Sequence, residues 1–292
     1  MKEENIIESP KNKVIKTLLI GLGNIGIIYD QNLSNEYILS HYRALNLNAN
    51  FKVIGIVDPN NDKIKKVKQT SFLITSNCIK DISKKIDNPE LVIVASSTEF
   101  HEENMIDILN FLKPKMIFSE KPITWNAKIS EKILNKCKEN KVELFVNFFR
   151  RSEPSMKYVK DLIMDRKLEG PADAVINYTG GFINNGSHFY DLLSDWFGEL
   201  VDSKKIECVP MGTSNDFYWR GVINFQRCTA YFRPIKAKEV DDHSFEIIFS
   251  NAKIVSQFAG RKTTIYRPKK DNIFKERKIF DNDTNIKNQY KQ

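Results

Sequence analysis

Residues 116–124 read MIFSEKPIT, and this stretch decides how the chain folds. It begins as a short apolar run and ends abruptly at Glu120, Lys121 and Pro122. An apolar run bounded in this way is typical of a buried strand that carries polar groups at its carboxyl edge. In an open parallel sheet, ligands bind at that edge. The stretch therefore predicts a ligand site that includes Lys121. It also predicts a domain boundary at Pro122, whose ring fixes the direction of the chain.

A glycine-rich turn lies upstream of this strand. Lys16–Ile20 is an apolar run that predicts a strand, and GLGNIG follows it directly at residues 21–26. In such a turn the first glycine permits the bend, the second lets a pyrophosphate approach the backbone, and the third lets the next helix pack on the strand. The N–H groups at the start of that helix attract phosphate. The residues predicted to hold a dinucleotide here are Gly21, Gly23, Asn24, Ile25 and Gly26.

Asp58 follows the next apolar run, Phe51–Val57. An acid at the tip of the second strand of a dinucleotide-binding fold bonds the adenosine ribose, and its charge repels a 2′-phosphate. The sequence therefore favours NAD, although Lys63 and Lys65 nearby leave NADP open.

The interval between the glycine turn and Asp58 is longer than usual, at about 30 residues against about 20 in most such folds. The surplus coincides with a polar and aromatic insertion, Tyr29–Ser40. Two interpretations are open: a loop or short helix near the mouth of the cofactor site, or a surface decoration.

The apolar run Leu91–Ala95 predicts a further strand, and SSTEFH follows at residues 96–101. Polar groups at this tip would face the nicotinamide side of a dinucleotide. The candidates are Ser96, Ser97, Thr98 and His101, although His101 has a second interpretation as a residue that caps or packs a helix start. Further strands are predicted at Phe72–Ile74 and Val142–Asn147, and helices at Asp62–Thr70, Ile79–Ile86, His101–Leu112 and Ser130–Asn140. This alternation predicts an α/β domain with a doubly wound parallel sheet, a Rossmann fold.

Beyond about residue 152 the pattern changes to β-rich runs with few helices between them. A helix is predicted at Met156–Asp165, and strands at Ala174–Tyr178, Lys205–Val209, Gly221–Phe225, Thr229–Phe232, Phe245–Phe249 and Lys253–Phe258. This pattern predicts an α+β domain with an open sheet that is mostly antiparallel or mixed. The expected organisation is a flexible extension (1–15), a dinucleotide-binding domain (16–122), an α+β domain for substrate and oligomerisation (123–280, with a helix–strand link at 123–151) and a tail (281–292).

Composition limits the class of protein. The net charge is +8, but the basic residues are mostly Lys, are spread along the chain and form no nucleic-acid-reading motif. We expect no membrane span and no signal peptide, because the chain lacks apolar runs of the needed length and position. The cysteines show no metal-binding or disulfide spacing: Cys78, Cys137, Cys208 and Cys228. These features predict a cytoplasmic protein that uses no metal and binds neither nucleic acid nor membrane.

A second motif occupies residues 180–198, GGFINNGSHFYDLLSDWFG. A turn precedes a helix on which His188, Asp191 and Asp195 recur at three- and four-residue spacing. A histidine in the first turn feels the positive end of the helix, which favours the neutral imidazole that a general base needs. The alternative interpretation is a histidine that bonds Asp191 and closes the core.

In combination, these motifs resemble the Gfo/Idh/MocA oxidoreductases over roughly residues 16–200. GLGNIG, Asp58-Pro59, SSTEFH, Glu120-Lys121-Pro122 and GSHFYDLL occur in the order and nearly the spacing of that family. The resemblance implies a Rossmann domain that binds NAD or NADP, and an α+β domain whose sheet often forms the oligomer face. It also implies a homodimer or homotetramer that acts on a sugar, a sugar derivative or a nucleotide sugar.

By this resemblance Lys121 is the catalytic lysine, Glu120 joins it beside the cofactor, and His188 is the acid/base. Many family members carry an aspartate four residues before the histidine, whereas this chain has Asn184. Asparagine can orient a ring but cannot carry charge. Three interpretations are open: another acid such as Asp191 supplies the charge, the proton is relayed through Lys121 or solvent, or the protein binds a cofactor without turnover.

Further polar and aromatic residues are candidates for substrate binding. Asn147, Arg150 and Arg151 follow a strand end, where arginines could hold an anionic group or could bond the domain seam. Tyr178 and Trp219 could stack on a sugar ring or could belong to the core. With Lys121, Asn184 and His188, they complete the predicted substrate site.

The predicted function is hydride transfer between NAD(P) and a hydroxyl or ketone of such a substrate, in sugar metabolism or polysaccharide biosynthesis. The alternative is a non-catalytic dinucleotide-binding sensor of the same fold. A glycosidase that uses bound NAD for a transient oxidation is the third possibility.

Overall fold

The computed structural model describes residues 14–70, 73–212, 215–237, 239–240, 242–269 and 272–283. The chain divides into two compact units, and it passes from the first to the second between Glu120 and Lys121. Unit 1 contains the described residues up to Ser34, Ile38–Glu120 and Ala127–Phe145, and unit 2 contains Asn35–Tyr37, Lys121–Asn126 and the described residues from Val146 onward. Of the expected extension and tail, residues 1–13 and 284–292 lie outside the described residues, as does Phe72.

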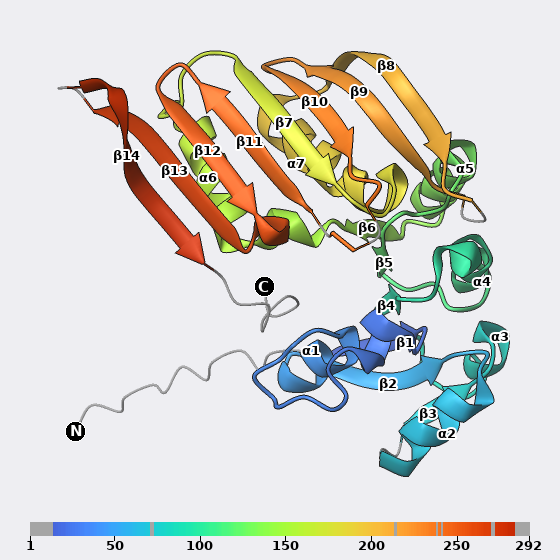
Figure 1. Cartoon of the computed structure of the whole chain (residues 1–292). Helices are drawn as coiled ribbons and strands as arrows, with labels where there is room; N and C mark the ends of the chain where they lie inside the picture. Colours follow the sequence, from blue (N-terminus) through green and yellow to red (C-terminus); the bar gives the residue numbers. More distant parts are fainter. Residues whose placement is uncertain are drawn as a thin grey trace, which may run out of the picture. The chain divides into compact units, whose positions relative to one another are not determined.

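Unit 1 is built on a six-stranded sheet with the order β3-β2-β1-β4-β5-β6 (Figure 1). The strands are β1 (Ile15–Ile20), β2 (Phe51–Val57), β3 (Ile74–Ser76), β4 (Leu91–Val94), β5 (Met116–Glu120) and β6 (Glu143–Asn147). The pairs β1–β2, β1–β4, β2–β3 and β4–β5 are parallel. Because β1 pairs with both β2 and β4, the order reverses there, and their carboxyl ends adjoin at the switch point where α/β folds bind ligands.

The strands of unit 1 are continuous apolar runs, as expected for a parallel sheet that helices cover on both faces. Leu18, Leu19, Ile56 and Val92 are fully buried. The helices are α1 (His41–Leu47), α2 (Asn61–Thr70), α3 (Ile79–Ile82), α4 (His101–Phe111) and α5 (Ala127–Glu139).

Local structure in unit 1 departs from the sequence prediction in three places. The helix expected directly after the glycine turn is only a five-residue π-helical turn, η1 (Asn24–Ile28), and α1 begins at His41 after the insertion. Strand β3 begins at Ile74 and extends beyond the predicted end. Helix α3 ends at Ile82, four residues early. Such short elements depend on packing more than on local propensity.

Unit 2 is an eight-stranded sheet with the order β14-β13-β12-β11-β7-β10-β9-β8. Its strands are β7 (Ala172–Tyr178), β8 (Leu200–Pro210), β9 (Phe217–Phe225), β10 (Cys228–Pro234), β11 (Ser244–Phe249), β12 (Ala252–Gln257), β13 (Lys262–Lys269) and β14 (Asn272–Asp283). Only β7–β10 is parallel among the described pairs, so the sheet is mixed, as predicted. Strands β13 and β14 were not predicted from the sequence.

One face of this second sheet carries α6 (Pro154–Met164) and α7 (Ser187–Phe197) (Figure 1). Between the helices and the strands lies an aromatic core that includes Tyr178, Trp196, Phe197 and Phe232. The fold class predicted from the sequence is confirmed: a doubly wound parallel sheet followed by a mixed open sheet.

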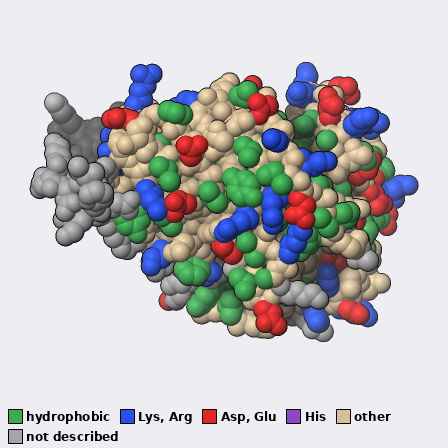
Figure 2. All heavy atoms as spheres, turned by 45° about the horizontal axis from the view of Figure 1, so that its top comes forward, with side chains coloured by type: hydrophobic (Ala, Val, Ile, Leu, Met, Phe, Trp, Pro, Cys, Tyr) green, Lys and Arg blue, Asp and Glu red, His purple; other side chains and the backbone are tan. Residues whose placement is uncertain are grey.

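The surface carries both signs of charge. On the face shown in Figure 2, basic and acidic side chains are interspersed with apolar ones, so the positive excess forms no continuous stripe there. In the part of the chain that the structure describes, helices long and apolar enough to cross a bilayer are absent.

Candidate functional site

A cavity of about 510 Å³ lies in unit 1 at the carboxyl ends of β1, β2 and β4. Seven residues predicted to hold a cofactor line it: Gly21, Gly23, Asn24, Ile25, Asp58, Ser96 and Ser97. Tyr29, from the start of the insertion, and Lys63 also line it. The cavity therefore occupies the switch point of the sheet, and most of the predicted cofactor residues meet there.

The three glycines of the turn have different tasks. Gly21 has φ +98°, and a Cβ there would lie 2.5 Å from the Ser96 amide nitrogen. A Cβ at Gly26 would lie 2.1 Å from the Gly21 carbonyl oxygen. A Cβ at Gly23, in contrast, would meet no atom of the described residues within 4 Å. The fold thus requires the first and third glycines, while the second keeps open the space that a phosphate group would fill.

Asp58 is fixed at the edge of this cavity. The side chain is only 5% exposed; Oδ2 accepts the Leu22 N–H at 2.7 Å, and Oδ1 accepts the Asn60 N–H at 2.8 Å. Lys63 Nζ lies 3.8 Å from Oδ2. Because a carboxylate has about four acceptor positions, Asp58 can hold the backbone and still accept from a ribose hydroxyl.

Five of the predicted cofactor residues do not line the cavity: Gly26, Thr98, His101, Glu120 and Lys121. Thr98 begins the short turn before α4. His101 is buried, and its Nε2 bonds the Ser96 carbonyl at 2.9 Å, which matches its interpretation as a packing residue. Glu120 is buried and bonds His41 Nε2 at 2.7 Å. His101 and Glu120 therefore fix strand tips, while Gly26 packs under the turn.

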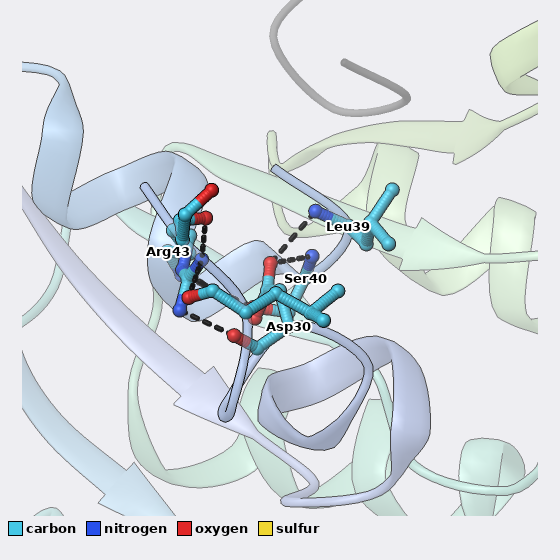
Figure 3. A network of polar contacts seen from close by, with 6 residues as sticks. Asp30, Leu39, Ser40 and Arg43 are labelled. Carbon is cyan, nitrogen blue, oxygen red and sulfur yellow. Dashed lines mark hydrogen bonds and ion pairs between the residues drawn. The ribbon is translucent and has the colours of Figure 1, made fainter. Parts of the chain in front are cut away.

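The insertion forms a closed loop with an ordered neck (Figure 3). Asp30, 2% exposed, accepts the N–H groups of Leu39 and Ser40 at 2.7 Å each and the Ser40 hydroxyl at 2.6 Å. Arg43 donates to the carbonyl of Asp30 and to two carbonyls further along the loop. Since Tyr29 lines the cavity, the insertion begins at the cavity wall and is held there by a buried charge.

Unit 2 contains a second group of candidate residues, which we call the polar cluster: Lys121, Asn184 and His188. Lys121 Nζ donates to the Asn184 side chain Oδ1 at 2.6 Å and to the Asn184 backbone carbonyl. Asn184 belongs to the π-helical turn η4 (Phe182–Gly186), which leads directly into α7 and His188. The ammonium and the motif of residues 180–198 therefore meet within unit 2.

His188 is held as a neutral imidazole. It is 3% exposed and packs edge-on against Phe148 and Phe149, with ring centroids at 5.9 and 5.1 Å. Burial lowers the pKa of His188 well below its ordinary value, and the charges of Arg150 and Lys121 lower it further. Nδ1 is buried and finds no hydrogen-bond partner among the residues that the structure describes. A neutral, buried imidazole with an unpaired nitrogen can accept a proton from a bound molecule.

Three of the predicted substrate residues are buried, namely Asn147, Arg150 and Tyr178, and a fourth, Arg151, is exposed but paired. Arg151 makes two hydrogen bonds to Asp191, at 2.5 and 2.6 Å, so this acid is already paired. Arg150 is buried, stacks on Phe149 and donates to the Ala259 carbonyl. Tyr178 is fully buried and Asn147 is buried at the end of β6.

Of the two roles that the sequence left open for Tyr178 and Trp219, the structure matches the second, that of core residues. The Tyr178 hydroxyl donates to the Trp219 carbonyl at 2.5 Å and accepts the Trp219 N–H at 2.9 Å. Both rings belong to or pack against the core of unit 2. Burial of the ring and pairing of its hydroxyl leave Tyr178 no surface for a sugar.

Two further polar residues, Asp216 and His243, lie close to the polar cluster and were not predicted from the sequence. The Asp216 carboxylate accepts the N–H groups of Ile183, Asn184 and Phe217. His243 shares a 3.1 Å hydrogen bond with Thr179 and adds to the repulsion that lowers the pKa of His188. Both lie in loops between strands, where no periodic pattern or motif marks them. In the described part of the chain, side chains do not gather into a metal-binding group.

Strand order, glycine turn and cavity define the class of protein: a dinucleotide-binding Rossmann fold joined to a mixed-sheet domain. The model of the Gfo/Idh/MocA family, described as an oxidoreductase family with an NAD-binding Rossmann fold, matches residues 15–148. The match covers the dinucleotide-binding part of the chain, and that part is similar to this family.

The relatives are dehydrogenases and reductases. The myo-inositol 2-dehydrogenase of Thermotoga maritima is 27% identical over 202 residues, which cover 63% of this chain and 55% of that protein. The match thus spans little more than half of this relative's length.

Two solved structures share the fold over most of the chain. The WlbA dehydrogenase of Bordetella pertussis, in complex with NADH and UDP-GlcNAcA, has a TM-score of 0.72 at 15% identity and covers 89% of this chain and 80% of its own. A 3-ketoreductase of Actinomadura kijaniata, in complex with TDP-benzene and NADP, has a TM-score of 0.72 at 14% identity and covers 96% and 87%. At these identities the likeness concerns the fold.

Proposed function

We propose that this protein is an NAD(P)-dependent dehydrogenase or reductase that acts on a hydroxyl or ketone of a sugar, a sugar derivative or a nucleotide sugar. The observation that carries the proposal is the polar cluster of unit 2, where Asn184 holds the Lys121 ammonium near a neutral, buried His188. The family match over residues 15–148 and the sugar and nucleotide-sugar ligands of the relatives support it. We also propose that the protein is soluble and cytoplasmic, and that it forms a homodimer or homotetramer.

The cofactor would be bound by unit 1. The open space beside Gly23 would take the pyrophosphate, Asp58 the adenosine ribose, and the strand tip at Ser96 and Ser97 the nicotinamide side. When bound, the nicotinamide would supply the hydride acceptor or donor. We favour NAD, because a fixed carboxylate lines the cavity and would repel a 2′-phosphate. Lys63 lies too close to that carboxylate to act as an independent positive charge.

The proton chemistry would fall to unit 2. Removing a hydride from a C–H bond must be accompanied by loss of the hydroxyl proton. The ammonium of Lys121 can donate to that oxygen and stabilise its developing negative charge. His188 is neutral, so it can accept the proton in oxidation and return it in reduction.

The first prediction tests this division of tasks. We expect Lys121→Ala to abolish turnover while the affinity for NADH stays within about twofold, because the side chain acts on the substrate oxygen and the glycine turn holds the cofactor. Turnover is followed at the reduced-nicotinamide absorbance over a panel of sugars and nucleotide sugars, and binding by fluorescence quenching. Lys138→Ala, on the exposed side of α5, is the matched control. Lost cofactor binding with retained turnover would contradict the assignment.

A second candidate is a non-catalytic dinucleotide-binding sensor. Asn184 favours it, since an amide cannot supply the charge that many family members place there. The same absorbance assay separates the two candidates. A sensor binds NADH but gives no absorbance change with any member of the panel.

A further inference from the structure

Asp216 lies in the loop before β9 and forms hydrogen bonds to the turn that contains Asn184. The carboxylate is 5% exposed, with both oxygens directed at backbone N–H groups. Oδ1 accepts from Ile183 and Oδ2 from Asn184, each at 2.8 Å, and Oδ1 also accepts from Phe217 at 2.7 Å. A buried carboxylate that accepts from three backbone N–H groups holds those donors in place.

The approach of this carboxylate to the turn is unusually close. Gly181 has φ +90°, and a Cβ there would lie 2.2 Å from Asp216 Oδ2. A side chain at that position would displace the acid, so the glycine is required by the carboxylate as well as by the backbone conformation. The contact joins the loop before β9 to the start of η4.

Asn184 links the Asp216 carboxylate to the Lys121 ammonium. Its N–H is held by Asp216, while its carbonyl oxygen and side-chain Oδ1 both accept from Lys121 Nζ. One residue therefore separates the carboxylate from the ammonium. A shift of the Asn184 peptide would move both acceptors of Lys121 together.

The acids on α7 are engaged elsewhere. Asp191 is paired with Arg151 in two hydrogen bonds. Asp195 accepts from Lys160 at 2.9 Å and lies 3.5 Å from Arg151. Because both acids are paired with basic side chains, neither supplies the negative charge that is missing at Asn184.

We propose that Asp216 is a positioning residue for Lys121, acting through Asn184, and that it supplies from a distant loop the negative charge that Asn184 lacks. An effect of Asp216 on catalysis rests on the proposed dehydrogenase function, whereas its effect on the position of Lys121 does not. The two can therefore be tested separately.

The direct test is the reactivity of Lys121 towards acetic anhydride, measured by peptide mass spectrometry on the full-length protein. In Asp216→Ala we expect Lys121 to be acetylated about tenfold faster, which is the lower end of the effect of losing one hydrogen bond to a charged group. Lys160 serves as the internal reference, because its partner Asp195 is unaffected. Asp202→Asn, at an exposed acid of β8 that accepts from Asn224, is the matched control.

A double-mutant cycle distinguishes positioning from general loosening. Asn184→Ala removes one of the two acceptors of Lys121 without touching Asp216. If Asp216 acts through Asn184, Asp216→Asn should change Lys121 reactivity much less in the Asn184→Ala background than alone. Equal effects in both backgrounds would overturn the proposal, as would unchanged reactivity of Lys121 in both Asp216 variants.

Kinetics provides the second readout. Once a substrate is found, we expect Asp216→Asn to lower kcat about tenfold or more, with the Kd for NADH within about twofold, because the glycine turn is untouched. An unchanged kcat would overturn the catalytic consequence. If the wild-type protein turns over no substrate, the proposed function fails while the reactivity cycle still decides the positioning. Near-ultraviolet circular dichroism of the Trp196 region confirms that each variant is folded.

Discussion

At the scale of single residues, His188 illustrates how burial sets a protonation state. Two aromatic rings, Phe148 and Phe149, and the cations Arg150 and Lys121 surround the imidazole. Every one of these neighbours disfavours the imidazolium. The proton of His188 is therefore bound more weakly in the folded protein than in the unfolded chain, and this difference links its charge to stability.

The second prediction concerns that link. The pKa of His188 is lowered on folding, so its contribution to stability is complete above the unfolded value of about 6.5 and is lost as the pH falls below it. We expect the melting temperature of wild type to fall between pH 7.5 and 5 more steeply than that of His188→Gln. Burial raises the pKa of Glu153 to about 7, which gives the opposite slope in the same range. The comparison is therefore made in a Glu153→Gln background, and parallel curves would contradict the prediction.

The third prediction concerns the choice of cofactor. We expect Asp58→Ser to shift the ratio of NADPH to NADH affinity by about tenfold or more towards NADPH, since the substitution removes the charge that faces a 2′-phosphate. Binding to wild type and variant is measured by fluorescence. Because Asp58 also holds Leu22 and Asn60, the variant should melt at a lower temperature. An unchanged ratio would place the 2′-phosphate elsewhere.

At the scale of elements, the insertion is the main departure from a plain dinucleotide fold. A short π-helical turn replaces the usual long helix after the glycine turn, and a loop with a buried neck precedes α1. Three hydrogen bonds to Asp30 and the donors of Arg43 close that neck. The loop is therefore an ordered element, although its composition resembles that of a surface segment.

The fourth prediction tests the neck. We expect Asp30→Ala to destabilise unit 1 by about 3 kcal/mol, because it leaves the buried donors of Leu39 and Ser40 without their acceptor and removes the carboxylate 3.7 Å from Arg43 Nε. Denaturant unfolding measures the change, and Asp62→Ala on exposed α2 is the control. NADH affinity should weaken as well, since Tyr29 adjoins Asp30 and lines the cavity. A change smaller than about 1 kcal/mol would mean that the loop is held by other contacts.

At the scale of the whole molecule, the sequence predicted those strands and domains that local residue patterns mark. Continuous apolar runs that end in polar residues predicted β1, β2, β4 and β5. The change near residue 152 to β-rich runs with few helices predicted the second sheet. The strand order of the first sheet follows from the Rossmann fold that those patterns predict. The Lys121–Asn184 contact joins two motifs that the sequence had singled out.

The remaining features depend on contacts between distant segments. Asp216 meets Asn184 across 32 residues, and Tyr178 meets Trp219 across 41, in each case through backbone groups that carry no sequence signature. The strands β13 and β14 are rich in charged residues, and they form because they extend an existing sheet rather than because of their own propensity. Residue type alone therefore could not distinguish the Tyr178 core position from a binding position.

The parallel pairing of β7 with β10 has a consequence for synthesis on the ribosome. β7 lies between β10 and β11, and its register with them involves residues up to Pro234 and Ile248. Neither neighbour exists when β7 leaves the exit tunnel, and long-range pairing of this kind is slow to form. The nascent chain must therefore keep β7 unpaired while about 56 more residues are translated, from Tyr178 to Pro234 at the end of β10. During this interval the strand is available to chaperones.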